Sequence, residues 1–157
     1  MAYRLRPARK SDEPAIWTAT METVWADVPE EERAGLDRRA FEASFREYAS
    51  EFVEGRRGER FVAEDAAGRL LGYIILGELR PFFSPKAVGF VYDLWVSPDH
   101  RRAGVARFLL MEADRWARSH GYGKIKLEVA EPNRGAKALY EKSGYAPERV
   151  YMGKRLG

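Results

Sequence analysis

One segment of the chain, residues 87–130, constrains the fold more than any other. It is typical of a strand at 87–96, a polar turn at 97–104, a helix at 105–119 and a second strand at 124–130. A strand, a helix and a strand in succession form a crossover unit, which is almost always right-handed and makes its two strands parallel. The chain is therefore expected to build an α/β sheet that contains a parallel pair.

The segments around this unit are predicted from hydrophobic periodicity and from proline and glycine positions. They are a strand at 3–7, a helix that starts near Asp12 and is broken by Pro29, a helix at 37–53, strands at 60–64 and 70–79, a helix at 132–142, and one last strand pair within 145–156. This order predicts a mixed central sheet flanked by helices. No repeat or linker interrupts the 157 residues, so we expect one domain over 1–157, a length that suits a single core.

Composition excludes several classes of site and partner. The chain has no cysteine and two histidines, so we expect no disulfide, no thiolate chemistry and no metal site. The formal net charge of +3 comes from a dense mixture of both signs and does not demand a nucleic-acid partner. No apolar run approaches the ~20 residues that cross a membrane, and no apolar signal region is evident. We therefore expect a cytoplasmic protein with neither a membrane nor a nucleic-acid partner.

The polar turn before the helix at 105–119 is the motif that points to chemistry. Its residues are Arg101-Arg102-Ala103-Gly104-Val105-Ala106. At a helix start the backbone N–H groups are unpaired and carry the positive end of the helix dipole, an arrangement that binds phosphate. The turn is neither a Walker loop nor a dinucleotide fingerprint, and a solvated helix start explains it equally well when it is taken alone.

Two motifs in the right order resemble the Gcn5-related N-acetyltransferase (GNAT) superfamily. The turn at 101–106 is similar to that family's Arg/Gln-x-x-Gly-x-Gly/Ala signature. Downstream, residues 133–145 resemble its second cofactor motif, Asn-x-x-Ala-x-x-Leu-Tyr-x-Lys-x-Gly-Phe/Tyr. The resemblance extends over nearly the whole chain. It implies the GNAT fold, in which the fourth strand splays away from the parallel fifth strand and acyl-CoA lies between them.

The resemblance also implies a function. It indicates an N-acetyltransferase that transfers an acetyl group from acetyl-CoA to a primary amine by direct attack in a ternary complex, without a metal. The implied partner is a small-molecule or peptide amine, and a homodimer is left open. A non-catalytic acyl-CoA-binding sensor or regulatory module is the alternative. The acceptor amine does not follow from the sequence, because a fold does not determine its substrate.

The cofactor-binding positions are carried over from the matched motifs. Backbone groups of Leu94 and Val96 are expected to pair with the pantetheine arm, while their side chains are typical of core residues. The pyrophosphate is expected on backbone N–H groups of Arg101, Arg102, Ala103, Gly104, Val105 and Ala106. Asn133 fits a helix N-cap as well as a cofactor contact.

Tyr140 matches the tyrosine that lies near the acyl-CoA sulfur in many family members. The resemblance implies that it contacts the cofactor and acts as the general acid for the departing thiolate, which a phenol with a pKa near 10 can do. Its position on an amphipathic helix also fits plain packing.

Asp93 is the candidate general base. Some family members carry a glutamate where this chain has Tyr92, one position earlier. Regular strand alternation places Asp93 on the opposite face from both Tyr92 and Leu94, unless a bulge intervenes. A salt-bridged structural aspartate explains Asp93 equally well. The weaker alternatives for the base are Glu78, Glu128 and Glu131.

The acceptor is expected to bind between the first two helices and the loop at 80–83. Aromatic and sulfur-containing side chains on those helices are candidates to line it, although core packing is the stronger explanation for them. They are Trp17, Met21, Trp25 and Tyr48.

Overall fold

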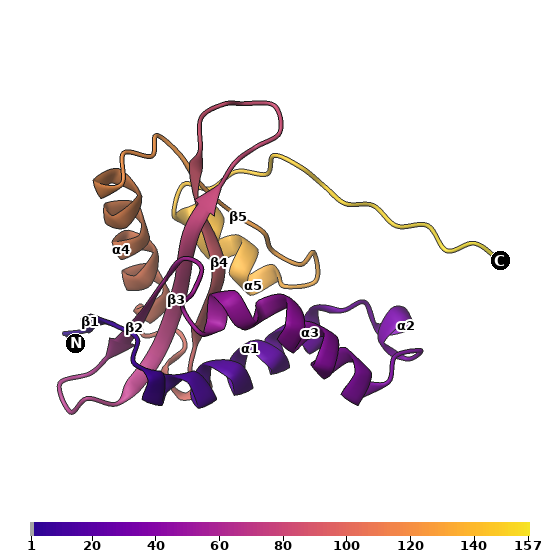
Figure 1. The fold of residues 1–157 in the computed structure, drawn as a ribbon, viewed down its shortest axis with the longest axis horizontal. Coiled ribbons are helices and arrows are strands. Elements are labelled where there is room, and N and C mark those ends of the chain that lie inside the picture. Colours follow the sequence, from indigo (N-terminus) through magenta and orange to yellow (C-terminus); the bar gives the residue numbers. More distant parts are fainter. Residues whose placement is uncertain (1) are drawn as a thin grey trace.

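The computed structural model describes residues 2–157 (Figure 1). Its helices and strands largely follow the predicted order. They are β1 (Arg4–Pro7), α1 (Glu13–Asp27), α2 (Glu30–Arg33), α3 (Arg38–Val53), β2 (Glu59–Glu64), β3 (Leu70–Leu79), β4 (Val88–Val96), α4 (Val105–Ser119), β5 (Ile125–Leu127) and α5 (Arg134–Lys142). None of the helices among these residues is long and apolar enough to cross a membrane.

The five strands form one mixed sheet in the order β1-β2-β3-β4-β5. The first three neighbouring pairs are antiparallel and the last, β4 with β5, is parallel. Helix α4 connects this parallel pair, which is the crossover unit that residues 87–130 predict. The fold class is therefore confirmed: α/β, with a mixed sheet and flanking helices.

Each face of the sheet has its own apolar core. On one face, Leu109 and Ala113 of α4 pack against Ile74 and Leu76 of β3. On the other face, side chains of α1 and α3 pack against Tyr73 and Ile75, among others. Figure 1 shows α4 standing apart from α1 and α3, with the sheet between them. Because Tyr73–Leu76 alternate between the two cores, every one of these side chains is buried.

The N-terminal strand is held by a buried ion-pair network. The Arg6 guanidinium donates to both carboxylate oxygens of Asp12, at 2.8 and 3.0 Å, and to Glu64 at 2.8 Å. Arg4 pairs with the same Glu64 carboxylate. Hydrogen bonds from Arg6 are the largest cause that lowers the pKa of both Asp12 and Glu64. These contacts fix β1 against β2 at the edge of the sheet.

The parallel pair is short, and the two strands then separate. Pairing of β4 with β5 covers only Gly89–Val91 against Ile125–Leu127. Strand β4 continues to Val96, so the stretch 92–96 has β3 on one side and no strand on the other within residues 2–157. The open β4 edge is the splay that the family resemblance implies.

The predicted strand pair within 145–156 does not form, and that prediction was wrong. Residues 145–157 have no regular secondary structure and residues 146–157 are exposed. Two lysines at the start of β5, Lys124 and Lys126, form ion pairs with Glu148. This contact brings the segment to the beginning of β5, and the chain then runs on away from the sheet (Figure 1). Sequence pattern predicts the extended conformation but cannot supply the neighbouring strand.

Candidate active site

A β-bulge in β4 interrupts the alternation of side chains between Tyr92 and Asp93. Ile75 of β3 pairs with Asp93, but the next residue, Leu76, pairs with Val91, so Tyr92 is an extra residue in β4. The bulge lets Tyr92 and Asp93 share one face. The contacts agree, since the Tyr92 ring packs 4.3 Å from the Phe52 ring of α3 while Asp93 bonds to Tyr73 in the same core.

The Asp93 carboxylate is held by hydroxyl groups rather than by a cation. Its Oδ2 accepts a 2.7 Å hydrogen bond from the Tyr73 hydroxyl, and Thr20 of α1 also hydrogen-bonds to it. No ion pair to Asp93 occurs in residues 2–157, so the salt-bridged alternative does not describe it. Burial is the largest effect on this group and raises its pKa, while the two hydroxyl hydrogen bonds oppose the rise. A carboxylate in this state can take up a proton near neutral pH more readily than an exposed one.

Tyr140 of α5 lies within electrostatic range of this carboxylate. Its pKa is raised to about 12, first by burial and then by the charges of Asp93 and Asp27. The Tyr140 ring packs at 6.0 Å against that of Tyr145, whose buried hydroxyl has no hydrogen-bond partner in the structure. The structure therefore brings the two predicted catalytic residues, Tyr140 and Asp93, into one electrostatic environment.

Asp27 is a further candidate site residue, which sequence reasoning missed. It is the last residue of α1 and is partly buried, and burial raises its pKa. Its charge also raises the pKa of both Asp93 and Tyr140. In the sequence Asp27 stands two positions before Pro29, at the end of the predicted helix, and no motif includes it. Nothing local indicated that the end of α1 approaches β4 and α5.

The basic turn has a strained and exposed backbone. Arg102 has φ 63° and Gly104 has φ 83°, and Arg102 is the one non-glycine residue with positive φ among the described residues. Such a conformation costs about 1–2 kcal/mol for a residue with a side chain, and strain of this kind clusters at functional sites. The Tyr3 hydroxyl donates to the Ala103 carbonyl, and the centre of the Tyr3 ring lies 5.7 Å from the centre of the Phe108 ring. Tyr3, the residue just before β1, thus helps to hold the turn in place.

The backbone donors of this turn are free. Within residues 2–157, the N–H groups of residues 102–106 have no hydrogen-bond partner outside helix α4. The N-cap residue of α4 is Gly104, so no side chain caps the helix start. Residues 101–104 are exposed, and the Arg101 Nε also donates to the Val96 carbonyl at 3.4 Å. The space where a Cβ of Gly104 would lie is open. A row of free N–H groups at a helix start with two exposed arginines suits a phosphate group.

Two of the other predicted positions lie on the open stretch of β4, and the third is at the start of α5. The side chains of Leu94 and Val96 pack into the core beneath α4, and their backbone lies on the stretch of β4 that has no β5 neighbour. The Asn133 side chain accepts a 3.2 Å hydrogen bond from the Ala136 N–H and so caps α5. The N-cap role of Asn133 is therefore present in the structure.

The weaker base candidates are engaged elsewhere or exposed. Glu78 pairs with Arg80 at 2.9 Å and accepts from the Tyr122 hydroxyl at 2.9 Å. Glu131 pairs with Lys137 at 2.9 Å, and Glu128 is exposed. Within residues 2–157, none of these three glutamate carboxylates forms a hydrogen bond or ion pair with the residues that surround Asp93.

The proposed acceptor side chains divide into packed and exposed ones. Trp25 packs 4.9 Å from Phe41, and the Arg38 guanidinium lies over the Trp25 ring, 4.7 Å from its centre. Trp17 packs against α3 in the same way, and Met21 is buried, which supports core packing for these three. Tyr48 is 72% exposed. A polar cavity of about 440 Å³ does lie beside the loop at 80–83, and it is lined by Arg57, Gly58, Gly77, Glu78, Leu79, Arg80 and Tyr92.

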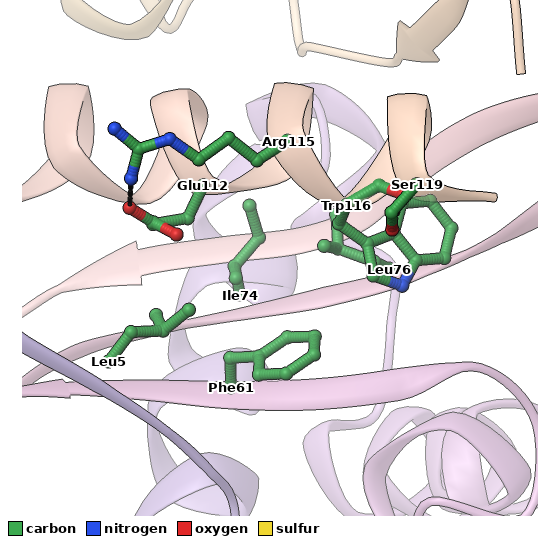
Figure 2. A pocket seen from close by; sticks show the side chains of 8 residues that line it. All are labelled: Leu5, Phe61, Ile74, Leu76, Glu112, Arg115, Trp116 and Ser119. Atoms are coloured by element: carbon green, nitrogen blue, oxygen red, sulfur yellow. Dashed lines mark hydrogen bonds and ion pairs between the residues drawn. The ribbon is translucent and has the colours of Figure 1, made fainter. Parts of the chain in front are cut away.

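A second cavity, of about 280 Å³, lies away from these residues (Figure 2). Figure 2 shows Leu5, Phe61 and Ile74 on the sheet facing the C-terminal half of α4, where Glu112 and Arg115 form an ion pair. The basic turn is at the opposite end of that helix, and Asp93 is on the opposite face of the sheet. This cavity therefore contains none of the predicted site residues.

Comparisons with known proteins agree with this geometry. A family model described as the acetyltransferase (GNAT) family matches residues 17–145. The chain is 36% identical over 72 residues to the uncharacterized N-acetyltransferase YycN of Bacillus subtilis (strain 168), covering 46% of each chain. It is 30% identical over 151 residues to the mycothiol acetyltransferase of Salinispora arenicola (strain CNS-205), covering 90% of this chain and 44% of that one.

The matched stretches thus span about half the length of these curated relatives. A solved structure described as a putative acetyl transferase from Pyrococcus furiosus has the same fold, with a TM-score of 0.82 and 22% identity over 99% of this chain and 100% of that one. The family model, the order of the two motifs and the splayed parallel pair lead to one assignment. The chain belongs to the acetyltransferase (GNAT) family.

Proposed function

We propose that this protein is an N-acetyltransferase that uses acetyl-CoA as co-substrate and acetylates a primary amine directly, in a ternary complex. One observation carries the catalytic part of the proposal: Asp93 is a partly buried carboxylate without a cation, beside the splay of β4 and β5 and within electrostatic range of Tyr140. Perturbed ionisable groups of this kind are typical of reaction sites. Family membership supplies the reaction class.

The basic turn is the proposed site for the phosphate groups of acetyl-CoA. The free N–H groups of residues 102–106 and the guanidinium groups of Arg101 and Arg102 supply hydrogen-bond donors and positive charge. The open edge of β4 at Leu94 and Val96 offers backbone groups to an amide-containing arm, as a sheet edge does for an added strand. These features fit a long, anionic, amide-bearing co-substrate such as acetyl-CoA.

Proton transfer is assigned to Asp93 and Tyr140. Only the neutral amine can attack, so an ammonium substrate first loses one proton to water. When the neutral nitrogen then bonds to the acetyl carbon, the carbon–sulfur bond breaks and the nitrogen loses a second proton. Asp93 accepts that proton, directly or through water, and its raised pKa suits the task. Tyr140 donates its hydroxyl hydrogen to the departing sulfur, and a pKa of about 12 keeps that hydroxyl protonated until it is needed. No enzyme-bound intermediate is required.

Asp27 is proposed to attract the amine acceptor. A primary amine is largely cationic at neutral pH, and two neighbouring carboxylates, Asp27 and Asp93, create a negative potential at the reaction site. The mycothiol acetyltransferase that resembles this chain is named for a small molecule. We propose a small cationic amine as the substrate class here as well, and the 157 residues as one catalytic domain.

The test is an acetyl-transfer assay with a matched pair of variants. Purified protein is mixed with acetyl-CoA and a panel of polyamines, amino acids, aminoglycosides and peptide N-termini, and release of the CoA thiol is followed. Gly104→Glu is expected to abolish acetyl-CoA binding, because it places an anion at the phosphate site. Gly68→Glu is the control, since Gly68 also has positive φ and open space around its Cβ position.

Turnover with any amine in the panel supports the proposal, provided that Gly68→Glu retains it and Gly104→Glu does not. Acetyl-CoA binding without turnover on the whole panel would instead favour a non-catalytic acyl-CoA sensor. Equal acetyl-CoA affinity in the two glutamate variants would contradict the assignment of the basic turn.

A further inference from the structure

The polar cavity beside the loop at 80–83 contains one guanidinium group without a carboxylate partner. Three charged side chains line this cavity, and two of them, Glu78 and Arg80, form an ion pair at 2.9 Å. The third, Arg57, is exposed and forms no ion pair within residues 2–157. Two positive groups and one negative group give the cavity a net positive charge, which attracts an anion.

An aromatic stack holds Arg57 at the cavity. The Arg57 guanidinium lies over the Phe52 ring, 5.1 Å from the ring centre. The centre of the Phe52 ring lies in turn 4.3 Å from that of Tyr92. A cation is attracted to the face of an aromatic ring, so this contact favours one place for the guanidinium. A guanidinium held in this way can offer two parallel N–H donors to a carboxylate.

Tyr92 connects this cavity to the candidate base. It is the extra residue of the β4 bulge and directly precedes Asp93. Its hydroxyl donates a 2.8 Å hydrogen bond to the Glu78 carbonyl, three residues along β3 from Ile75, which pairs with Asp93. Three residues of a strand cover about 10 Å. The Tyr92 side chain therefore lies along the sheet, from Asp93 toward the cavity.

A glycine makes room for this ring. A Cβ at position 77 would lie 2.7 Å from the Tyr92 ring, which is too close for a real contact. Gly77 also lines the cavity, so a side chain there would displace the ring and occupy part of the space. The absence of a side chain at Gly77 thus preserves both the cavity and the position of Tyr92.

The two ends of the Tyr92 side chain face opposite charges. At one end are the carboxylates of Asp93 and Asp27; burial raises the pKa of Asp93, and the charge of Asp27 adds to that rise. At the other end, burial raises the pKa of the Tyr92 hydroxyl, and the positive charge of Arg57 opposes that rise. A ligand complementary to both ends has a cationic amine and an anionic group.

We propose that the acceptor amine also carries a carboxylate, which binds Arg57 in this cavity while the amine nitrogen lies at Asp93. The inference rests on the proposed acetyl transfer and narrows the acceptor to a primary amine with a carboxylate at its far end. An extended chain advances about 1.2 Å per backbone atom, so about eight atoms span the ~10 Å between the two ends.

The test compares two ligands that differ in one charge. Calorimetry with CoA in excess measures the affinity of the protein for 8-aminooctanoate and for its neutral amide, 8-aminooctanamide. The acid is expected to bind about tenfold more tightly, because only the carboxylate forms charge-assisted hydrogen bonds with the guanidinium. Arg57→Gln is expected to remove this difference. Arg56→Gln is the matched control and should retain it, because Arg56 is also exposed but pairs with Glu54.

Chain length tests the two-point geometry. The four-carbon acid 4-aminobutyrate is too short to reach both ends, so it should bind no better than its own amide. Equal affinity for 8-aminooctanoate and its amide, binding of neither, or a preference that survives in Arg57→Gln overturns the proposal. An equal preference for the acid at both chain lengths overturns it too.

An acetyl-transfer assay on the same ligands separates this proposal from the proposed function. Transfer to 8-aminooctanoate and to its amide with equal kcat/KM overturns the carboxylate site and leaves the transferase function standing. Binding of 8-aminooctanoate through Arg57 without transfer to any amine overturns the role of this ligand as an acceptor, and with it the transferase function, while the carboxylate site itself stands.

Discussion

The Tyr73 hydroxyl donates a 2.7 Å hydrogen bond to Oδ2 of Asp93, across the β3–β4 pair. Asp93 pairs with Ile75, two residues from Tyr73 along β3, so strand alternation places Asp93 on the same face as Tyr73. Tyr73 is 1% exposed and its own pKa is raised well above the usual value, chiefly by burial, so it donates and does not ionise. The Tyr73 hydroxyl thus holds the Asp93 carboxylate in place without neutralising its charge.

Asp93→Asn is expected to lower kcat by about 100-fold, because the variant cannot accept the proton from the amine. In the unmodified enzyme the base must be ionised, and its pKa is raised, so kcat/KM should fall as the pH is lowered through that raised value. Steady-state assays across pH measure this acid limb. Asp93→Asn should remove the limb, and an unchanged limb in that variant would exclude Asp93 as the base.

Tyr73→Phe is the companion to that experiment. It removes a hydrogen bond that stabilises the ionised form of Asp93, so the pKa of Asp93 should rise further. The acid limb of kcat/KM should then move to higher pH, with the plateau rate retained at alkaline pH. A limb that does not move would show that this hydrogen bond has no influence on the titrating group.

Tyr140→Phe is expected to lower kcat by about 100-fold and to leave acetyl-CoA affinity within about twofold, because only the proton donor is lost. Tyr145→Phe is the control. Its ring packs against Tyr140, but its buried hydroxyl has no partner, so removing that hydroxyl should change neither rate nor affinity. Stopped-flow rates and calorimetric affinities separate the two quantities. Equal rates for the two variants would rule out Tyr140 as the general acid.

Asp27→Asn is expected to raise KM for a cationic amine by about tenfold, which corresponds to about 1.4 kcal/mol. KM for acetyl-CoA should not change, because Asp27 is proposed to act on the acceptor alone. Glu22→Gln, an exposed carboxylate on the same helix, is the control for a general loss of negative charge. A similar rise in both variants would indicate non-specific attraction.

Arg6→Ala is expected to destabilise the fold by about 3 kcal/mol, since it leaves the carboxylate of Asp12 buried without its bidentate partner. The pKa of Asp12 is lowered in the folded state, so its contribution to stability is present above pH ~4 and lost as the pH falls through the lowered value. Urea unfolding at several pH values should therefore show a shallower acid dependence in Arg6→Ala. Equal slopes would contradict this account.

Much of this protein follows from its sequence alone. The period of apolar residues, Pro29 and the glycines around the basic turn determine where most helices and strands lie, because these are local properties of the backbone. The same is true of the Arg101–Ala106 turn and of the motif around Tyr140, whose chemistry depends on residues close together in the chain. Family membership follows from these two motifs.

Other features depend on residues that are far apart in the sequence, and only the tertiary structure determines these features. Tyr92 and Asp93 share one face because of a bulge, which arises from the pairing of β4 with β3 and has no signature in Tyr92-Asp93 itself. The role proposed for Asp27 depends on where the end of α1 lies relative to α5. The strand pair predicted within 145–156 failed for the same reason: alternation predicts an extended segment, but a strand exists only where a second backbone offers its hydrogen bonds.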